Sequence, residues 1–398
     1  MITRRGFLKA CGFVPATLLT APVVVMPAPT NFMPNLPANT WTTIPSTKLV
    51  LAMPLIDPAF HDFGSGGFSG VESAWSGAAF SAKRGKLYVF GGGHLDSSNN
   101  GLYTIDLTTG QVGVACQPTP YTQAQWTALQ NDYNTNPASP RRWNSWTDGE
   151  RYSDYLTDAQ GVVKPTATHT YGAMCDCAEL GMLVIPHASR YWHFHYATGL
   201  WEKGAAYLPR SGWKANMLCF WDEVNKKVIT TNTNANDYWG VSVYDPIAKV
   251  EIKLEMNTGG LPGVKYNTNG MRATRMTGTR KLLCLGAGVA WTINLDNLTA
   301  PIVNIPITVA ESGTLSRGWN VYANNKMYLL QSDGALQTFD PATGAFAMVA
   351  TTDAPPPMND QAQINYCWGR YFLYQGCICV APGVGNDLYV LRPASASR

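Results

Sequence analysis

Charged residues make up only 14% of the 398-residue chain, and the formal net charge at pH 7 is only +3. Such a small net charge does not indicate the excess of basic residues that is typical of nucleic-acid-binding proteins. The sequence also lacks a long amphipathic helical pattern, and its nine cysteines lack the Cys-x-x-Cys pairs of a structural zinc site. What it has instead is 37 glycines, 13 tryptophans and 19 tyrosines, a composition that favours an all-β protein with many turns.

The N-terminus reads MITRRGFLKACGFVPATLLTAPVVVMPAP, a pair of arginines before Gly-Phe-Leu-Lys and a weakly apolar run. This pattern resembles the twin-arginine export signal of bacteria. It predicts a signal peptide and linker over residues 1–37, and a periplasmic or secreted protein with no transmembrane segment after the signal is removed. No clean Ala-x-Ala motif marks the cleavage site.

A repeat begins in the stretch KLYVFGGGHLDSSNNGLYTIDLTTG, residues 86–110, which alternates strand patterns with turn signals as a four-stranded meander does. The segment from Trp319 matches this plan element by element. Weaker copies begin at residues 169, 216, 271 and 364. Six copies, mostly about 50 residues apart with a larger gap of about 90 residues between the first two, predict the blades of a β-propeller that forms a single domain over residues 38–398.

Two features complete this domain. A polar insertion over about 113–167 separates the first two copies, and we expect a functional loop there, although it could hide a degenerate seventh blade. The last copy stops at Leu391 without an outer strand, whereas the segment Trp41–Thr47 is a strand candidate with no blade of its own. We therefore predict that this N-terminal strand pairs with Leu388–Leu391 and closes the ring, which hides the sheet edges. We expect the protein to be a monomer.

The YVFGGG strand, the aromatic-Asp endings of LYTIDL and LQTFD, and the TTG and PATG turns resemble kelch repeats. The whole series is similar to the central propeller of the galactose oxidase family. This resemblance implies the fold and leaves the function open, because propellers include enzymes, sugar-binding proteins and interaction scaffolds. The two tyrosines and two histidines that hold copper in that family cannot be matched to positions here, so no cofactor is predicted, although a metal ion is possible.

Five of the six histidines fall in the first two copies. His94 follows the glycines at 91–93, which let the backbone turn tightly and approach its neighbours, so we expect it in a loop that faces a groove. His169 and Tyr171 directly follow the insertion and are expected to reach the same groove. A buried structural histidine is the alternative for His94.

This set matches β-elimination of a uronic-acid polysaccharide, in which a base removes the proton beside the carboxylate, an acid protonates the leaving oxygen, and a cation neutralises the carboxylate. The predicted catalytic residues are His94, His169, Tyr171, Arg142 and Arg317. The predicted substrate-binding residues are Asp96, Asn100, Trp146, His187 and Trp239. The tryptophans that neighbour glycines, asparagines and arginines suit sugar rings.

Other functions remain open from sequence. A glycoside hydrolase would use paired carboxylates, for which Asp96, Asp148, Glu150 and Asp154 are candidates. A non-catalytic carbohydrate-binding or protein-interaction propeller is the main alternative. His193 and His195 should share one face of a strand and could form a metal pair, although histidines packed among aromatic side chains are the preferred interpretation.

Overall fold

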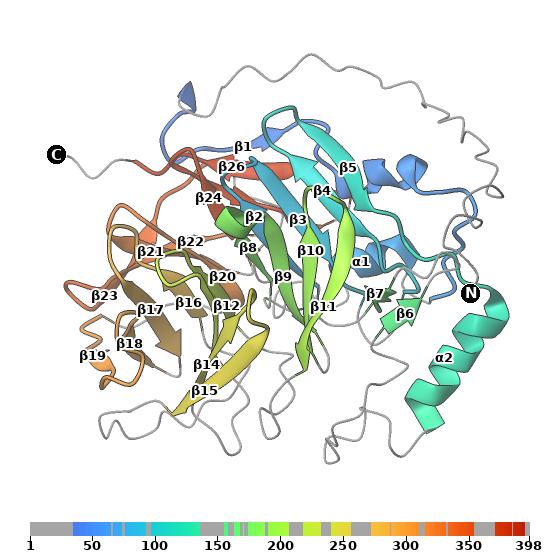
Figure 1. The fold of residues 1–398 in the computed structure, drawn as a ribbon. Helices are drawn as coiled ribbons and strands as arrows, with labels where there is room; N and C mark the ends of the chain where they lie inside the picture. Colours follow the sequence, from blue (N-terminus) through green and yellow to red (C-terminus); the bar gives the residue numbers. More distant parts are fainter. Residues whose placement is uncertain are drawn as a thin grey trace.

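The computed structural model describes residues 35–64, 67–73, 76–92, 97–135, 155–157, 163–167, 170, 174–187, 190–206, 218–231, 240–255, 272–286, 288–309, 315–331, 333–353, 371–383 and 385–394. These residues form six four-stranded antiparallel sheets arranged in a ring, with few helices (Figure 1). The chain is a six-bladed β-propeller, which confirms the predicted fold class.

Each of the first five blades consists of four strands that are consecutive in the chain. Blade 1 contains β2 (Gly77–Ser81), β3 (Lys86–Phe90), β4 (Leu102–Asp106) and β5 (Gln111–Cys116); blade 2 contains β8 (Cys175–Cys177), β9 (Met182–His187), β10 (Arg190–His195) and β11 (Leu200–Ala206). Blade 3 contains β12 (Leu218–Asp222), β13 (Lys227–Thr231), β14 (Gly240–Asp245) and β15 (Val250–Glu255); blade 4 contains β16 (Arg272–Arg275), β17 (Lys281–Gly286), β18 (Val289–Asn294) and β19 (Val303–Ile305). Blade 5 contains β20 (Leu315–Ala323), β21 (Lys326–Gln331), β22 (Leu336–Asp340) and β23 (Ala345–Val349); blade 6 contains β24 (Tyr371–Tyr374), β25 (Cys377–Val380), β26 (Leu388–Leu391) and β1 (Trp41–Ile44).

The hydrophobic core is divided among the blade interfaces. First strands of neighbouring blades contact each other, as β2 does with β8 and β16 with β20, which places them nearest the axis of the ring. Each of six apolar clusters gathers side chains from two adjacent blades. Because a blade is covered on both faces, its middle strands are apolar on both faces, as in the KLYVF sequence of β3.

The N-terminal strand closes the ring as predicted. β1 pairs antiparallel with β26, with Trp41 opposite Leu391 and Ile44 opposite Leu388. Trp41 and Ile44 are both buried. The outer strand of the last blade is thus supplied from the other end of the chain, and β26 is not left as an open edge.

The Asp that ends the third strand of several repeats has a local structural role. In blade 1 the Oδ1 atom of Asp106 accepts hydrogen bonds from the Thr108 N–H at 2.9 Å and from its hydroxyl at 2.5 Å. Asp245 and Asp340 likewise accept hydrogen bonds from N–H groups two residues further on. A carboxylate at this position therefore fixes the turn into the fourth strand, which explains the repeated sequence signal.

Helices and one hairpin lie outside the blades. They are η2 (Leu49–Leu55), η3 (Gly67–Ser69), α1 (Gly70–Ser73), α2 (Gln123–Thr135) and η5 (Ala178–Leu180), with the hairpin of β6 (Tyr155–Thr157) and β7 (Val163–Pro165). The predicted insertion thus begins with the end of β5 and then contains α2 and the hairpin. None of the described helices is long and apolar enough to cross a membrane.

The helix α2 was missed from sequence, although a short signal marks its start. The Thr122 N–H donates to Gln125 Oε1 at 2.8 Å, and the Gln125 N–H donates to Thr122 Oγ1 at 3.2 Å. This reciprocal pair is a capping box. Trp126 is buried and lies edge-on against Tyr121, with ring centroids 5.7 Å apart, which fixes the first turn of the helix to the protein.

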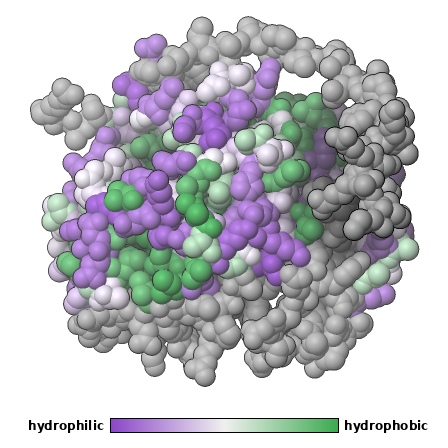
Figure 2. Space-filling model, in the orientation of Figure 1, coloured by the Kyte–Doolittle hydropathy of each residue, from purple (hydrophilic) through white to green (hydrophobic). Residues whose placement is uncertain are grey.

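In the outer strand of blade 3 a charged side chain is buried and its two apolar neighbours are exposed, the reverse of the usual alternation of buried apolar and exposed polar residues. Glu251 is buried and its carboxylate accepts a hydrogen bond from the Tyr191 hydroxyl at 3.0 Å, whereas Val250 and Ile252 are exposed. Figure 2 shows hydrophobic surface gathered on the side of the ring where β14 and β15 lie in Figure 1. The register of β15 therefore places an acidic side chain at the interface with blade 2 and apolar side chains in solvent.

Candidate functional site

Most of the residues predicted for catalysis and substrate binding lie outside the described part of the chain. These are His94, Asp96, Arg142, Trp146, His169, Tyr171 and Trp239. His187 ends β9 of blade 2, and Arg317 lies in β20 of blade 5. The structure describes the backbone of both residues but not their side chains. Asn100 is described with its side chain.

Thr170, which stands between His169 and Tyr171 in the sequence, is buried and joins the ends of two strands of blade 1. Its hydroxyl donates a hydrogen bond to the carbonyl oxygen of Phe90 at 2.8 Å and accepts one from the N–H of Gly77 at 2.7 Å. Phe90 ends β3 and Gly77 begins β2. The chain that leaves the insertion is therefore fixed to blade 1 before it enters blade 2.

The glycines before His94 allow close backbone approach, as predicted. A Cβ atom on Gly91 would lie 2.1 Å from the Oγ atom of Ser76, and one on Gly92 would lie 2.7 Å from the Cβ atom of Ala167. Real Cβ atoms do not come so close, so each contact requires glycine. Gly92 thus packs against Ala167, which precedes His169 by two residues.

The residues that follow Asp96 are fixed by the carboxylate of Asp62. That carboxylate accepts hydrogen bonds from the Ser97 hydroxyl at 2.8 Å, the Ser98 N–H at 3.0 Å and the Ser98 hydroxyl at 3.1 Å. Ser97 and Ser98 are fully buried. A segment that precedes blade 1 in the chain therefore holds the second half of the connection between β3 and β4.

The amide of Asn100 is fully buried and is used within the protein. Its Nδ2 atom donates to the Pro165 carbonyl at 2.9 Å and to the Thr119 hydroxyl at 3.1 Å, while its Oδ1 atom accepts from the Thr119 N–H at 2.7 Å. These bonds tie the connection between β3 and β4 to both ends of the insertion. Asn100 therefore supports the loops, and its predicted contact with a substrate stays a prediction.

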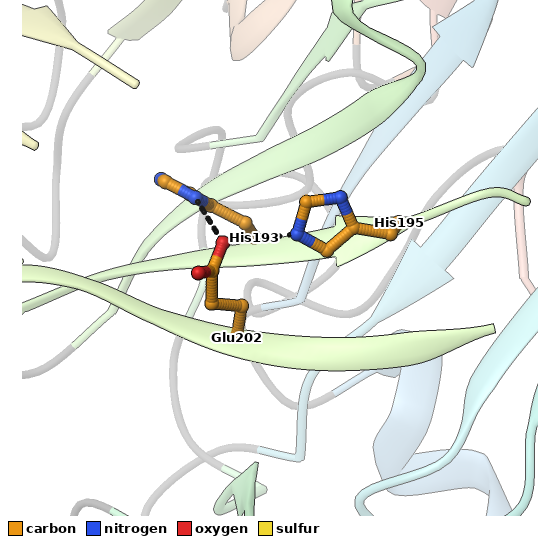
Figure 3. A group of neighbouring side chains, drawn as sticks. All are labelled: His193, His195 and Glu202. Carbon is orange, nitrogen blue, oxygen red and sulfur yellow. Dashed lines mark hydrogen bonds and ion pairs between the residues drawn. The ribbon is translucent and has the colours of Figure 1, made fainter. Parts of the chain in front are cut away.

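A second group of candidate functional side chains lies at the interface of blades 2 and 3. His193 and His195 project from one face of β10 toward Glu202 of β11 (Figure 3). The Oε2 atom of Glu202 lies 3.4 Å from His193 Nδ1 and 3.0 Å from His195 Nε2. Among the described residues, these are the His, Cys, Asp and Glu side chains that come close enough in a group of three to hold a metal ion, since their ligand atoms lie within 4.8 Å of one another.

Blade 3 contributes the outer contacts of this cluster. The Nε2 atom of His193 is hydrogen-bonded to the Tyr244 hydroxyl at 2.8 Å, and the Tyr244 ring stacks on that of Tyr191 with centroids 3.7 Å apart. The Lys249 ammonium donates to Glu202 Oε1 at 2.5 Å. The second carboxylate oxygen of Glu202 is thus the one that faces both histidines.

The pKa values of His193 and Glu202 are both lowered, but for different reasons. Burial lowers the pKa of His193 to about 4, so its imidazole is neutral at pH 7 even though Glu202 lies beside it. The hydrogen bond from Lys249 lowers the pKa of Glu202 to about 2, and the histidine hydrogen bonds act in the same direction. At neutral pH the contact of His193 with Glu202 is therefore a hydrogen bond between a neutral ring and a carboxylate and not an ion pair.

The preferred interpretation of the histidine pair was partly right. The ring centroids of His193 and Tyr244 lie 5.7 Å apart, but His195 is one-third exposed and both histidines contact the Glu202 carboxylate. Glu202 was missed because it lies on the next strand, and its position opposite His193 becomes visible only from the strand register. The Sγ atoms of Cys175 and Cys177 lie 4.0 Å apart on the same side of β8.

Comparison with known proteins adds no functional assignment. No family model and no curated protein matches the chain. Among solved structures, a chain of the "Crystal Structure of Mitotic Checkpoint Complex" is similar at 9% identity, with 96% of this chain and 98% of that chain covered and a TM-score of 0.43. A similarity at this level carries no argument, so the class of the protein comes from its own six blades. The kelch-like family and the export signal stay predictions.

Proposed function

We propose that this propeller is exported by the twin-arginine route and cleaves a uronic-acid polysaccharide by β-elimination, at the end of blades 1 and 2 where the insertion meets the connection between β3 and β4. The observation that carries the proposal is the convergence of the described residues on either side of the predicted catalytic histidines. Thr170 is bonded to Phe90, and Gly92 packs against Ala167. Sequence neighbours of His94 and His169 are therefore in contact, which a shared proton-transfer site needs.

In the proposed reaction one of the two histidines removes the proton beside the substrate carboxylate. The electron pair forms the new carbon–carbon double bond as the glycosidic carbon–oxygen bond breaks, and Tyr171 or the other histidine protonates the leaving oxygen. Arg142 or Arg317 neutralises the carboxylate as negative charge builds up on it. No oxidant or reductant is required, because elimination conserves the electrons of the substrate.

The rigid surroundings support a positioned site. Asn100 bonds to residues 119 and 165, and Asp62 holds residues 97 and 98, so several segments that border the predicted groove are fixed to one another. Such support limits the motion of groups that must lie within hydrogen-bond distance of a substrate proton. A flexible polar loop would not provide it.

The test is a screen of acidic and neutral polysaccharides for new ultraviolet-absorbing unsaturated ends, with the full chain as catalyst. A substrate that reacts is then offered to His94→Ala and His169→Ala, which should lose turnover while keeping the thermal stability of the wild type. His61→Ala is the matched control, because His61 is exposed and lies outside the predicted set. Glycan binding without product, or no product and no binding with any uronic-acid polysaccharide, would overturn the lyase proposal.

A further inference from the structure

We propose that His193, His195 and Glu202 form a binding site for a late first-row transition-metal dication, of which Zn²⁺ is the representative, with one coordination position left open. The ligand atoms are His193 Nδ1, His195 Nε2 and Glu202 Oε2. Imidazole nitrogens with one carboxylate oxygen are a donor set that suits this class of metal.

The distances between these atoms suit a small ion. A tetrahedral zinc ion with bonds of about 2.0 Å separates neighbouring ligand atoms by about 3.3 Å. Glu202 Oε2 already lies 3.4 Å from His193 Nδ1 and 3.0 Å from His195 Nε2. His193 is fully buried and fixed, whereas His195 is one-third exposed and can adjust its ring to complete the geometry.

The surroundings also provide the outer contacts that a ligating histidine needs. When Nδ1 of His193 binds a metal, its proton resides on Nε2, and the Tyr244 hydroxyl lies 2.8 Å away to accept it. The stack of Tyr244 on Tyr191 fixes this partner. Exposure of Glu202 and His195 leaves one side of the site open to solvent, where water or an external ligand can take the fourth position.

The other blades show that the fold does not require this cluster. His193 stands two residues before the end of the third strand of its blade, and Glu202 lies directly opposite on the fourth strand. In blades 1, 3, 4 and 5 these two positions hold small or apolar residues, or threonine with such a partner. They are Thr104 and Gly113, Val243 and Ile252, Thr292 and Val303, and Thr338 and Ala347. Blade 2 therefore carries a histidine–glutamate pair where four other blades build the same pairing without one.

The position of His195 at the end of its strand also differs from the equivalent position in other blades. His195 ends β10 where Asp106, Asp245 and Asp340 end their strands and cap their own turns. In place of that local role, His195 bonds to Glu202. Two independent departures from the repeat, at the strand end and in the strand pair, thus converge on one set of ligand atoms.

Lys249 is expected to affect the affinity of the proposed site for the metal ion. It adopts a φ of 55° at a turn position where Gly110, Gly199 and Gly344 have φ values of 67°, 67° and 72°. A side chain other than glycine is strained there. Its ammonium holds Glu202 Oε1, which orients the carboxylate and offsets its charge, so we expect binding of moderate affinity that strengthens when Lys249 is removed.

The experiment measures Zn²⁺ binding by calorimetry on the full chain after treatment with a chelator, with Co²⁺ absorption as a report on coordination geometry. One Zn²⁺ should bind per chain, and Co²⁺ should give the intense visible bands of a tetrahedral site. His195→Ala and Glu202→Gln change partly exposed side chains, and each should weaken binding by about 100-fold, whereas Tyr244→Phe should weaken it by about tenfold. Lys249→Gly, which suits the turn, should tighten binding by on the order of tenfold.

His61→Ala controls for adventitious binding to an exposed histidine and should leave the affinity unchanged. Three results would overturn the proposal: no Zn²⁺ bound by the wild type, equal affinity in wild type and Glu202→Gln, or a cobalt–thiolate band that shows the metal bound to cysteine. None of these readouts depends on glycan cleavage.

Discussion

Mild acid should destabilise the protein through His193, because the folded state resists protonation of this ring. The side chain is fully buried and burial lowers its pKa to about 4, whereas an imidazole in the unfolded chain takes up its proton near 6.5. Between these two values the unfolded state binds more protons than the folded state. The free energy of unfolding therefore falls as the pH drops from about 6.5 toward 4.

The size of the effect follows from the difference between the two pKa values. Each pH unit is worth about 1.4 kcal/mol, so the full difference amounts to about 3 kcal/mol, of which about 2 kcal/mol is already lost at pH 5. The pKa of Glu202 is also lowered, but a carboxylate loses its contribution only below its ordinary value of 4.5. Measurements between pH 7 and pH 5 thus isolate the histidine from its carboxylate partner.

The assay is denaturant unfolding at intervals across this range in the presence of a chelator, for the wild type and for His193→Gln. Glutamine cannot titrate but keeps an amide that can bond to the Tyr244 hydroxyl. The difference in unfolding free energy between the two proteins should change by about 2 kcal/mol from pH 7 to pH 5, with the wild type losing more. Parallel curves for the two proteins would refute this account of His193.

Three further predictions address ring closure, the predicted groove and export. Trp41→Ala should lower the unfolding free energy by about 3 to 5 kcal/mol, measured by denaturant unfolding, because it removes a buried indole from the strand that closes the ring. Asn100→Ala should cost about 3 kcal/mol in the same assay, since it leaves the Thr119 N–H and the Pro165 carbonyl without this partner; an unchanged midpoint would contradict the role given to the amide. Replacing both Arg4 and Arg5 by lysine should retain the protein in the cytoplasm in a fractionation experiment, and undiminished export would remove the twin-arginine assignment.

The six blades and their closure could be predicted because the signals for them are local and repeated. An Asp at the end of the third strand, a glycine in the turn after it and a two-residue alternation recur in several copies, and each has a direct structural cause. The partner of Trp41 was predictable by elimination, since β26 pairs with β25 on one side and otherwise lacked a neighbour on the other. The helix α2 was not predicted, because its one clear mark is the four-residue capping box at Thr122.

The candidate metal cluster shows the limit of such reasoning. The sequence places His193 and His195 on one face of a strand, but it does not show which outer-strand residue lies opposite them. That information comes from the register, which pairs His193 with Glu202. The sequence also does not show that Lys249, from the next blade, reaches the Glu202 carboxylate, because this contact depends on how the two sheets pack.

The two proposed sites can be tested separately because the described residues that border the first site and those that form the second lie at opposite ends of the strands of blade 2. Thr170 is bonded to the end of β3 and the start of β2, the end at which β8 also begins, whereas His195 stands opposite Met182 at the start of β9. Side chains in such distant, unshared surroundings contribute independently to stability and binding. Glu202→Gln should therefore weaken Zn²⁺ binding and leave glycan cleavage intact, whereas His94→Ala should abolish glycan cleavage and leave Zn²⁺ binding unchanged. Loss of both properties in either variant would show that the sites are coupled through blade 2, and the metal would then have to be treated as a part of the catalytic apparatus.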